Sequence, residues 1–556
     1  MIAARAASVV YQLYDHPGSG PNSTIARERE TIMTKFSDSS SVTELNHVSN
    51  PSRRTFLGAT VVAAGGLLAG GGVSGQTAQG VAAHDRPSPE KGGRTQVQAL
   101  AEYAARAKFE DLSPESRRQL PIHILDSVGC CIAALGAGPI NACRDQVTDF
   151  GGSGPCTLIG GGKANPVYAA FWNTALVRYV DFMDNFLAQS ETCHTADNFG
   201  VALTIADYVG ASGRDLMLGV ALGYTVQSRF VDHANFMTRG FDHTTQLAFS
   251  HNAMGGRLLG LSDRQIANAI AMAAVSDASF AVVRAKPLSQ WKGLASAQSA
   301  LGAMNTLFLA RRGVEGPLQV IEGPLGINHL LGMTIDIDWD RQGYEGVTES
   351  TIKKYNAVIH SQSAIYCMVE LVKKRQVDPE QVMAIEAEVF QLCYDFAGGG
   401  LYGTDKVIRT KEEADHNLAY LLSAALIDGD VTPAQFDPAR IAKPDVQTLM
   451  KRVSTRPNAT FTAQYPRKMP ARITVRLKDG TVVQHEVQDY PGLASRPFTW
   501  DESSEKFDRL VDGRVDAGLS GEIKDAVRRL DSLQARDLTG LLSNVKTPTF
   551  LPMNEN

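Results

Sequence analysis

The sequence has few cysteines, and they do not form a recognisable framework. Its 556 residues contain seven cysteines, none in a C-x-x-C pair or in a Cys/His series at metal-ligand spacing. The odd number and the lack of pairs argue against a disulfide-stapled protein, an iron–sulfur cluster or structural zinc. We therefore expect most of the cysteines to be small apolar residues of the core.

Two further absences narrow the function. The net charge is −5, so there is no basic excess to attract nucleic acid or an anionic membrane surface. The common catalytic signatures are also missing: there is no G-x-S-x-G, no Walker loop, no H-E-x-x-H and no credible G-x-G-x-x-G. With 44% hydrophobic and 20% charged residues, the composition is that of an ordinary globular protein, and the length predicts two domains with appendages.

The N-terminal region has the features of a leader. Residues 52–72, SRRTFLGATVVAAGGLLAGGG, join a paired arginine to an apolar run shorter than the roughly 20 residues that span a bilayer. The pattern resembles a twin-arginine export signal, and the small residues Val81 and Ala83 suit a peptidase. We predict a disordered leader over 1–90, export to the periplasm or cell exterior, and no stable membrane anchor. The alternative is a disordered basic and apolar extension that is not used as a signal, in a cytoplasmic protein.

Helix signals dominate residues 91–347. Apolar residues recur there at three and four residue spacing, and breaks occur at clusters of glycine, proline and serine. Ser113 and Pro114 supply an N-cap and a proline at the first helical position, and the residues SDRQ at 262–265 form a capping box. These signals predict a large all-helical domain.

After about residue 348 the pattern changes. Residues 384–396 alternate apolar and polar side chains in the manner of a strand, and 471–490 predict two strands joined at the turn KDG. Helices are expected between them, one beginning near Lys411. The predicted fold class is therefore mainly α: a large helical domain, an inserted smaller α+β lid domain over 348–492, and C-terminal helices within 493–556 that return to the helical domain.

The segment DFMDNFLAQSETCHTADNFG, residues 181–200, concentrates polar groups in an apolar region. If this segment began as a helix, Asp181 and Asp184 would share a face at i,i+3. Each carboxylate would then move the pKa of the other, which suits acid–base chemistry. Asp184, Glu191 and His194 could equally be surface groups at a helix end.

Isolated histidines and lysines stand in apolar sequence further along the chain. They are His243 in RGFDHTTQ, Lys292 in SQWKGLAS, and Lys353 and His360 in IKKYNAVIHSQSA, with His416 as a supporting candidate. Each has a plain alternative, since a lone histidine is often a hydrogen-bonded structural group and a lysine can extend to water. Together they match what is needed to hold a substrate with several carboxylates and to move a proton near one of them.

The order of these stretches resembles the MmgE/PrpD family. The likeness covers about residues 97–543 and includes LDSVGCCIAALG, the D-x-x-D…H segment, GFDHTT, WKGLASAQSALGAMNTLFLARRGVEGP, IKKYN…HSQSA and ADHNLAYLLSAALIDG. The resemblance implies a helical domain with a smaller lid, a homodimer, and a site between the domains that uses no metal or other cofactor. Its expected partner is a small polycarboxylate substrate.

The resemblance also implies roles for individual residues. The predicted catalytic residues are Asp181, His194, His243, Lys292 and His360. The predicted substrate-binding residues are Asn185, Lys353, Lys292 and Asp184. The chain departs from the family at three positions, with Asn185 in place of threonine and with Thr195 and Asn356 in place of proline, so these positions bear on the exact substrate.

The predicted reaction is a metal-independent dehydration of a hydroxy di- or tricarboxylic acid of the 2-methylcitrate type. The two lysines and His360 would neutralise carboxylates and stabilise enolate-like charge, with about 3 kcal/mol from each preorganised donor. His194 and His243 would be the acid and the base, in an order that the sequence leaves open, and Asp181 would orient them or share the proton.

Two alternatives remain. The same site could decarboxylate or epimerise a related polycarboxylate at the same activated carbon. The chain could also be an exported carboxylate-binding protein that has lost catalysis, for which the three departures from the family are the sequence indication. A purely structural role is disfavoured because it leaves the ordered polar positions unexplained.

Overall fold

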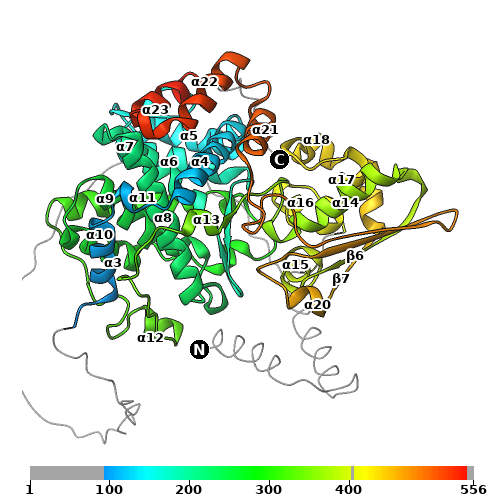
Figure 1. The fold of residues 1–556 in the computed structure, drawn as a ribbon, viewed down its shortest axis with the longest axis horizontal. Helices are drawn as coiled ribbons and strands as arrows, with labels where there is room; N and C mark the ends of the chain where they lie inside the picture. The colour runs from blue at the N-terminus through cyan, green and yellow to red at the C-terminus, as the bar shows by residue number, and fades with distance from the viewer. Residues whose placement is uncertain (1–92, 402, 404–405, 547–556) are drawn as a thin grey trace, which may run out of the picture. The chain divides into compact units, whose positions relative to one another are not determined.

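The computed structural model describes residues 93–401, 403 and 406–546, and the predicted leader with its export signal lies outside them. The described chain is mainly helical and has three small sheets (Figure 1). This confirms the predicted fold class, a mainly α protein with a smaller α+β region.

The first part of the described chain is a layered set of helices. Its longer helices are α3 Gln96–Ala105, α4 Pro114–Ala134, α5 Gly138–Phe150, α6 Pro166–Tyr179, α7 Phe199–Val209, α8 Gly213–His233, α9 Leu247–Leu258, α10 Asp263–Ser276 and α11 Ala295–Arg311. The predicted caps are confirmed: Ser113 Oγ accepts from Ser116 N at 3.0 Å before α4, and Ser262 forms a capping box with Gln265 before α10.

Short strands tie the loops of this part together. They are β1 Cys156–Thr157 with β2 Lys163–Ala164, and β4 Thr192–Cys193, β3 Asn185–Leu187 and β5 Ser350–Thr351 in that spatial order. Strand β3 pairs antiparallel with both neighbours, and Asn185 lies opposite Thr351. The start of the polar 181–200 segment is thereby fixed to the chain just before Lys353.

The second part is built on a four-stranded sheet in the order β7-β6-β8-β9. The strands are β6 Val382–Val389, β7 Val453–Pro457, β8 Ala471–Leu477 and β9 Val482–Val487, and the main helices are α14 Gln362–Arg375 and α17 Leu418–Asp428. The predicted hairpin over 471–490 is confirmed by the antiparallel pairing of β8 with β9. Strand β7, parallel to β6, was not expected.

The predicted strand over 384–396 is wrong in its second half. Strand β6 ends at Val389, and the chain turns into α15 Gln391–Cys393 and then a π-helical turn at Tyr394–Gly398. The period-two pattern continues past the sheet because Cys393 and Ala397 face the core of the second part from this turn. One consequence is that Phe396 is carried toward the candidate site described below.

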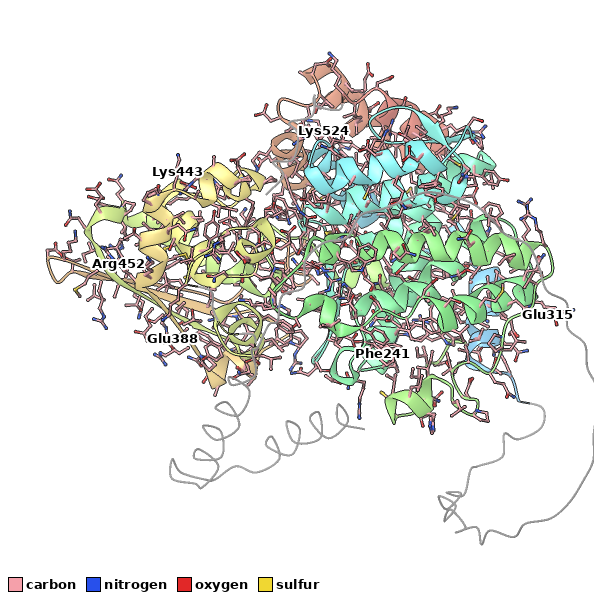
Figure 2. All side chains as sticks on the ribbon, turned by 180° about the vertical axis from the view of Figure 1, so that it is seen from behind. Phe241, Glu315, Glu388, Lys443, Arg452 and Lys524 are labelled. Carbon is pink, nitrogen blue, oxygen red and sulfur yellow. The ribbon has the colours of Figure 1, made fainter. Side chains whose placement is uncertain are left out.

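Each part has its own hydrophobic core. The larger core takes residues from Val97 to Val347 and again from Phe507 to Val545, and the smaller one takes residues from Tyr355 to Leu493. Figure 2 labels Glu388, Lys443 and Arg452 on the sheet-containing part, Phe241 and Glu315 on the helical part, and Lys524 on the C-terminal helices. We call these two regions the helical part and the lid part.

The C-terminal helices α21 Trp500–Val511, α22 Ala517–Arg528 and α23 Ala535–Ser543 pack on the helical part. One of their side chains, Lys506, is buried and forms an ion pair with Asp126 of α4. Its ammonium also donates to the backbone oxygens of Phe182 and Lys353, each at 2.8 Å. Helix α21 thus holds two chain segments that adjoin the candidate site.

The cysteines and the apolar helices agree with a packed interior. All seven cysteines are free and buried, which confirms their expected place in the core. Within the described residues, no single helix is long and apolar enough to cross a membrane, and one pair, α4 with α5, satisfies length and composition together but is bent by 89°.

Candidate active site

A pocket is lined by side chains of both parts. The helical part supplies Arg178, Asp181, Asn185, Thr192, His194, Met237, His243, Arg284, Lys286, Leu288 and Lys292. The lid part and the segment leading into it supply Lys353, Val358, Ile359, His360, Phe396 and His416. The lining therefore includes all the predicted site residues except Asp184.

Asp181 is the centre of an ionic cluster in this pocket. Helix α6 ends at Tyr179, and Asp181 takes a left-handed φ of 56°, so the chain does not continue as a helix. Its Oδ1 accepts from Arg178 Nη1 at 2.9 Å and from Lys353 Nζ at 2.7 Å, and its Oδ2 accepts from Lys292 Nζ at 3.0 Å. Burial alone would raise the pKa of Asp181, but the three cations outweigh it and hold that pKa well below its usual range.

Lys292 lies between two carboxylates and a histidine. The short helix Gln290–Gly293 places its Nζ 3.0 Å from Asp181 Oδ2, 3.2 Å from Asp415 Oδ1 and 3.2 Å from His416 Nδ1. Ligand atoms of Asp181, Asp415 and His416 lie within 4.8 Å of one another, a spacing that could surround a cation. The Lys292 ammonium occupies the centre of this group and supplies its positive charge.

Lys353 joins the helical part to the lid. Besides the Asp181 carboxylate, its Nζ donates to the backbone oxygen of Asp181 at 2.8 Å. The side chain is fully buried, and burial lowers its pKa to about 8 against the opposing effect of Asp181. Lys353 is therefore a cation whose charge is lost near pH 8.

His194 has a defined hydrogen-bond partner on one ring nitrogen. Asn185 lies beside it, with 2.8 Å between the amide and His194 Nδ1. With the amide oxygen facing the ring, the amide nitrogen donates to the backbone oxygens of Asp184 at 3.2 Å and Met183 at 3.3 Å. In this orientation His194 Nδ1 is the donor and Nε2 keeps its lone pair.

His243 has a charged partner at the corresponding position. It follows Asp242, whose Oδ1 lies 3.3 Å from His243 Nδ1. Arg284 pairs with the same carboxylate through Nε at 2.8 Å and Nη2 at 3.1 Å, and its Nη2 lies 3.4 Å from His243 Nε2. Burial alone would raise the pKa of Asp242, but Arg284 and His243 hold it well below the usual range.

The two histidines are neighbours. Their ring centroids are 4.9 Å apart, although 49 residues separate them in the sequence. Burial and the positive charge of the pocket lower both pKa values, and the pKa of His194 lies well below its ordinary value. Both rings are therefore neutral at physiological pH.

His360 is enclosed by aromatic rings of the lid part. It stacks on Phe396 at 5.2 Å between centroids, with Phe390 and Tyr465 nearby. Burial lowers its pKa to about 3, so it enters the site as a neutral imidazole. Its Nδ1 is buried and has no hydrogen-bond partner among the described residues.

Asp184 does not line the pocket. It also does not share a face with Asp181, so the predicted helix at the start of this segment is wrong. Its Oδ2 contacts His123 Nδ1 at 2.6 Å and accepts from Tyr224 Oη at 2.8 Å. Its Oδ1 accepts from Thr195 Oγ1 and from Ala196 N, both at 2.8 Å. Asp184 thus fixes the chain immediately after His194.

The surface alternative for this segment is wrong. Asp184, Glu191 and His194 are 0%, 3% and 9% exposed. Glu191 accepts from Phe236 N at 3.0 Å and from Gln246 Nε2 at 2.7 Å, and burial raises its pKa to about 9. It is a protonated internal group at neutral pH and not a helix-end charge.

Several pocket residues were not selected from the sequence. Arg178 is an ordinary-looking basic residue in the last turn of α6, and Arg284 lies in a stretch without a motif. Asp242 and Asp415 each directly precede a candidate histidine, and this Asp-His order was the available signal for both. The counter-ion of each cation depends on segments far apart in the chain, which sequence spacing does not reveal.

The charges of the pocket favour an anionic ligand. Five cationic side chains and one carboxylate line it, while the lining also includes four histidines. Asp415 and Asp242 lie behind this surface and offset part of the positive charge. Because Arg178, Lys292 and Lys353 are buried and held by Asp181, they can stabilise negative charge that develops on a bound molecule.

Two family models match most of the described chain. The MmgE/PrpD N-terminal domain matches residues 98–339, and the MmgE/PrpD C-terminal domain matches residues 355–532. The boundary between the two matches falls in the segment that carries Lys353.

Relatives with assigned names align with about 70% of this chain. A 2-methylcitrate dehydratase of Cupriavidus necator is 25% identical over 439 residues, which are 73% of this chain and 87% of the relative. The mitochondrial 2-methylcitrate dehydratase of Yarrowia lipolytica is 24% identical over 73% of this chain and 80% of the relative. Human cis-aconitate decarboxylase is 23% identical over 69% of this chain and 80% of the relative.

Proposed function

The chain belongs to the MmgE/PrpD family, and from this premise we propose that it is a lyase that dehydrates a hydroxy di- or tricarboxylic acid of the 2-methylcitrate type. The observation that carries the proposal is the pocket in which a cation cluster adjoins a pair of neutral histidines. The cations match the carboxylates of such a substrate, and the histidines match the two proton transfers of a dehydration.

The cation cluster would bind the substrate carboxylates. Asp181 balances only part of the charge of Arg178, Lys292 and Lys353, so bound carboxylates complete the balance in a dry environment. Charge that develops on the substrate when a proton leaves the carbon next to a carboxylate would be stabilised by the same groups. Each preorganised donor is worth about 3 kcal/mol at the transition state.

The histidine pair would move the protons. One neutral ring takes the proton from the carbon, the carbon–oxygen bond breaks, and the other ring, which holds a proton once the carboxylates are bound, protonates the departing hydroxide to give water and a conjugated acid. Bound carboxylates also raise the depressed pKa values of both rings, because they bring negative charge to a pocket whose lining has more cations than carboxylates. Asp181 keeps its negative charge and orients the lysines.

The test is turnover of a panel of hydroxy and unsaturated polycarboxylates by the full chain. Growth of the ultraviolet band of a conjugated acid supports dehydration. Release of carbon dioxide would instead indicate decarboxylation. Loss of optical rotation without a new double bond would indicate epimerisation at the same carbon. Thermal stabilisation by citrate-like acids with no turnover would favour the carboxylate-binding protein.

The matched variants are Lys292→Met and Lys443→Met. Lys292→Met removes the ammonium at the centre of the cluster and should reduce kcat by at least on the order of 10²-fold. Lys443 is exposed on the lid part, and its replacement should leave kcat unchanged. Circular dichroism of both variants checks folding, and full activity of folded Lys292→Met would remove this lysine from the site.

Assembly and location complete the proposal. The family resemblance supports a homodimer, which light scattering of the purified chain would test, and a monomer would contradict it. The paired arginine of the leader supports export, and cell fractionation after Arg53→Lys with Arg54→Lys would test it. An unchanged distribution of the variant would contradict use of the signal.

A further inference from the structure

The two histidines of the pocket differ in the group that meets Nδ1. His194 Nδ1 faces the amide oxygen of Asn185 at 2.8 Å, and His243 Nδ1 faces the carboxylate of Asp242 at 3.3 Å. An amide oxygen accepts a hydrogen bond without adding charge, whereas a carboxylate favours the charged ring.

We infer that the liganded pair holds one proton and that it resides on His243, so that His194 Nε2 is the base and His243 the acid, with Asn185 as the positioning residue that fixes the His194 tautomer. The assignment of base and acid rests on the proposed dehydration. The tautomer and the site of the proton rest on the hydrogen-bond partners and hold for any anionic ligand.

Asn185 is held in the orientation that this requires. It begins β3, opposite Thr351 of β5, and is fully buried. Its amide nitrogen is directed at two backbone oxygens, those of Met183 and Asp184, which can only accept. A reversed amide would place its oxygen against those two acceptors, so the oxygen must face His194 and the ring must donate from Nδ1.

The other groups around His194 oppose a charged ring. Arg178, Lys353 and His243 each disfavour a proton on it, and Asp181 favours one. Asn185 adds no charge to this balance. His194 therefore remains the less proton-binding member of the pair and presents a free Nε2 lone pair.

The surroundings of His243 favour a protonated ring more than those of His194 do. Burial, Arg284 and Arg178 oppose a proton on it, whereas Asp242, which contacts Nδ1, favours one. Arg284 shares the Asp242 carboxylate, and its Nη2 lies 3.4 Å from His243 Nε2, so it weakens the preference for a charged ring and must turn aside when Nε2 carries a proton. With 4.9 Å between the two centroids, a second proton on the pair would place two positive rings in contact, so the pair titrates as one coupled unit.

The proton balance of a turnover follows from this arrangement. His194 Nε2 takes a proton from carbon as the electron pair forms the double bond, the carbon–oxygen bond breaks, and His243 gives its proton to hydroxide to form water. The proton is then on His194 and must return to His243. The contact between the rings allows this return through one water molecule, and the product leaves both residues ready for the next cycle.

The experiment uses the full chain labelled with ¹⁵N in histidine, with His194→Gln and His243→Gln for assignment. Ring nitrogen shifts report tautomer and charge across pH, first without ligand and then with citrate as the probe. In the native chain we expect a neutral Nδ1–H tautomer at His194, and with citrate a proton on His243 at pH values where His194 remains neutral.

Two substitutions test the asymmetry itself. Asn185→Asp should raise the pKa of His194 by about one unit or more, since a carboxylate replaces the amide oxygen. The acidic limb of kcat against pH should move up accordingly. Asp242→Asn should lower the pKa of His243, move the alkaline limb to lower pH and reduce kcat by on the order of 10²-fold or more.

A third pair of substitutions separates positioning from packing. Asn185→Ser keeps an oxygen that can accept from Nδ1 and should retain the Nδ1–H tautomer, whereas Asn185→Leu should lose it. The inference would be overturned by an Nε2–H tautomer of His194 in the native chain, or by a proton on His194 when citrate is bound. It would also be overturned if Asn185→Asp and Asp242→Asn moved the same limb of the pH profile. If the tautomer and the proton site were as expected but the chain turned over none of the polycarboxylates, only the proposed dehydration would be contradicted.

Discussion

Asp181 and Asp184 are three residues apart, equally buried, and differ completely in what surrounds them. Asp181 is held by charged groups from both parts of the molecule, Arg178, Lys292 and Lys353. Asp184 is held by neutral donors and one histidine, all within or beside the helical part. Two buried carboxylates close in sequence therefore have different roles: Asp181 sets the charge of the site, and Asp184 fixes the chain that carries His194.

The largest effect is expected from Asp181→Asn. This change leaves three buried cations without their shared carboxylate, and breaking such a buried pair costs about 3–5 kcal/mol of unfolding free energy. kcat should fall by at least on the order of 10²-fold, because the lysines lose their orientation. Denaturant unfolding and steady-state kinetics measure both effects, and the exposed Asp340→Asn should leave both unchanged.

Asp184→Asn should have a smaller effect on activity. The amide of the variant keeps one acceptor oxygen, but its NH2 group faces groups that donate to Asp184 in the native chain. These groups are Thr195, Ala196, Tyr224 and His123, and we expect a loss of about 1–3 kcal/mol of unfolding free energy. We expect the kcat loss to be smaller than in Asp181→Asn, with ligand affinity retained. Equal loss of citrate binding in the two variants, measured by calorimetry, would erase the distinction between the two carboxylates.

The smallest effect concerns pH. The pKa of Lys353 near 8 means that the Asp181 cluster loses a cation as pH rises, whereas the Asp184 contacts include no lysine. kcat/KM, which reports the free enzyme, should decline above about pH 8, and Lys353→Arg should move this decline to higher pH because a guanidinium stays charged. An unchanged alkaline limb in that variant would assign the decline to another group.

Much of the fold followed from local signals. The caps at Ser113 and Ser262 and the hairpin over 471–490 depend on neighbouring residues, so the sequence alone was enough to predict them. The end of β6 did not follow, because the apolar alternation continues into a turn that packs on the same core. Local periodicity marks which face is buried but not where the hydrogen-bonded ladder stops.

The candidate site, like the fold, could be predicted only in part from the sequence. Most of the candidate residues lie together in one pocket, because motif order selected residue types that the chemistry needs. Asp184 was grouped with Asp181 by helical spacing, but α6 ends at Tyr179 and the left-handed Asp181 turns the two side chains apart. Arg178 and Arg284 could not be selected, since their counter-ions are defined only by the assembled structure.

The buried Lys506 of α21 sets a condition on when the site can exist. It holds the backbone oxygens of Phe182 and Lys353, and 324 residues separate it from Phe182. At a ribosomal rate of roughly 5–20 residues per second, Lys506 is added about 16 to 65 s after Phe182. From the addition of Lys353 until that of Lys506, the nascent chain carries the aspartate and lysines of the pocket without the Lys506 contacts that set their spacing. A site with this spacing therefore forms only after synthesis has passed Lys506.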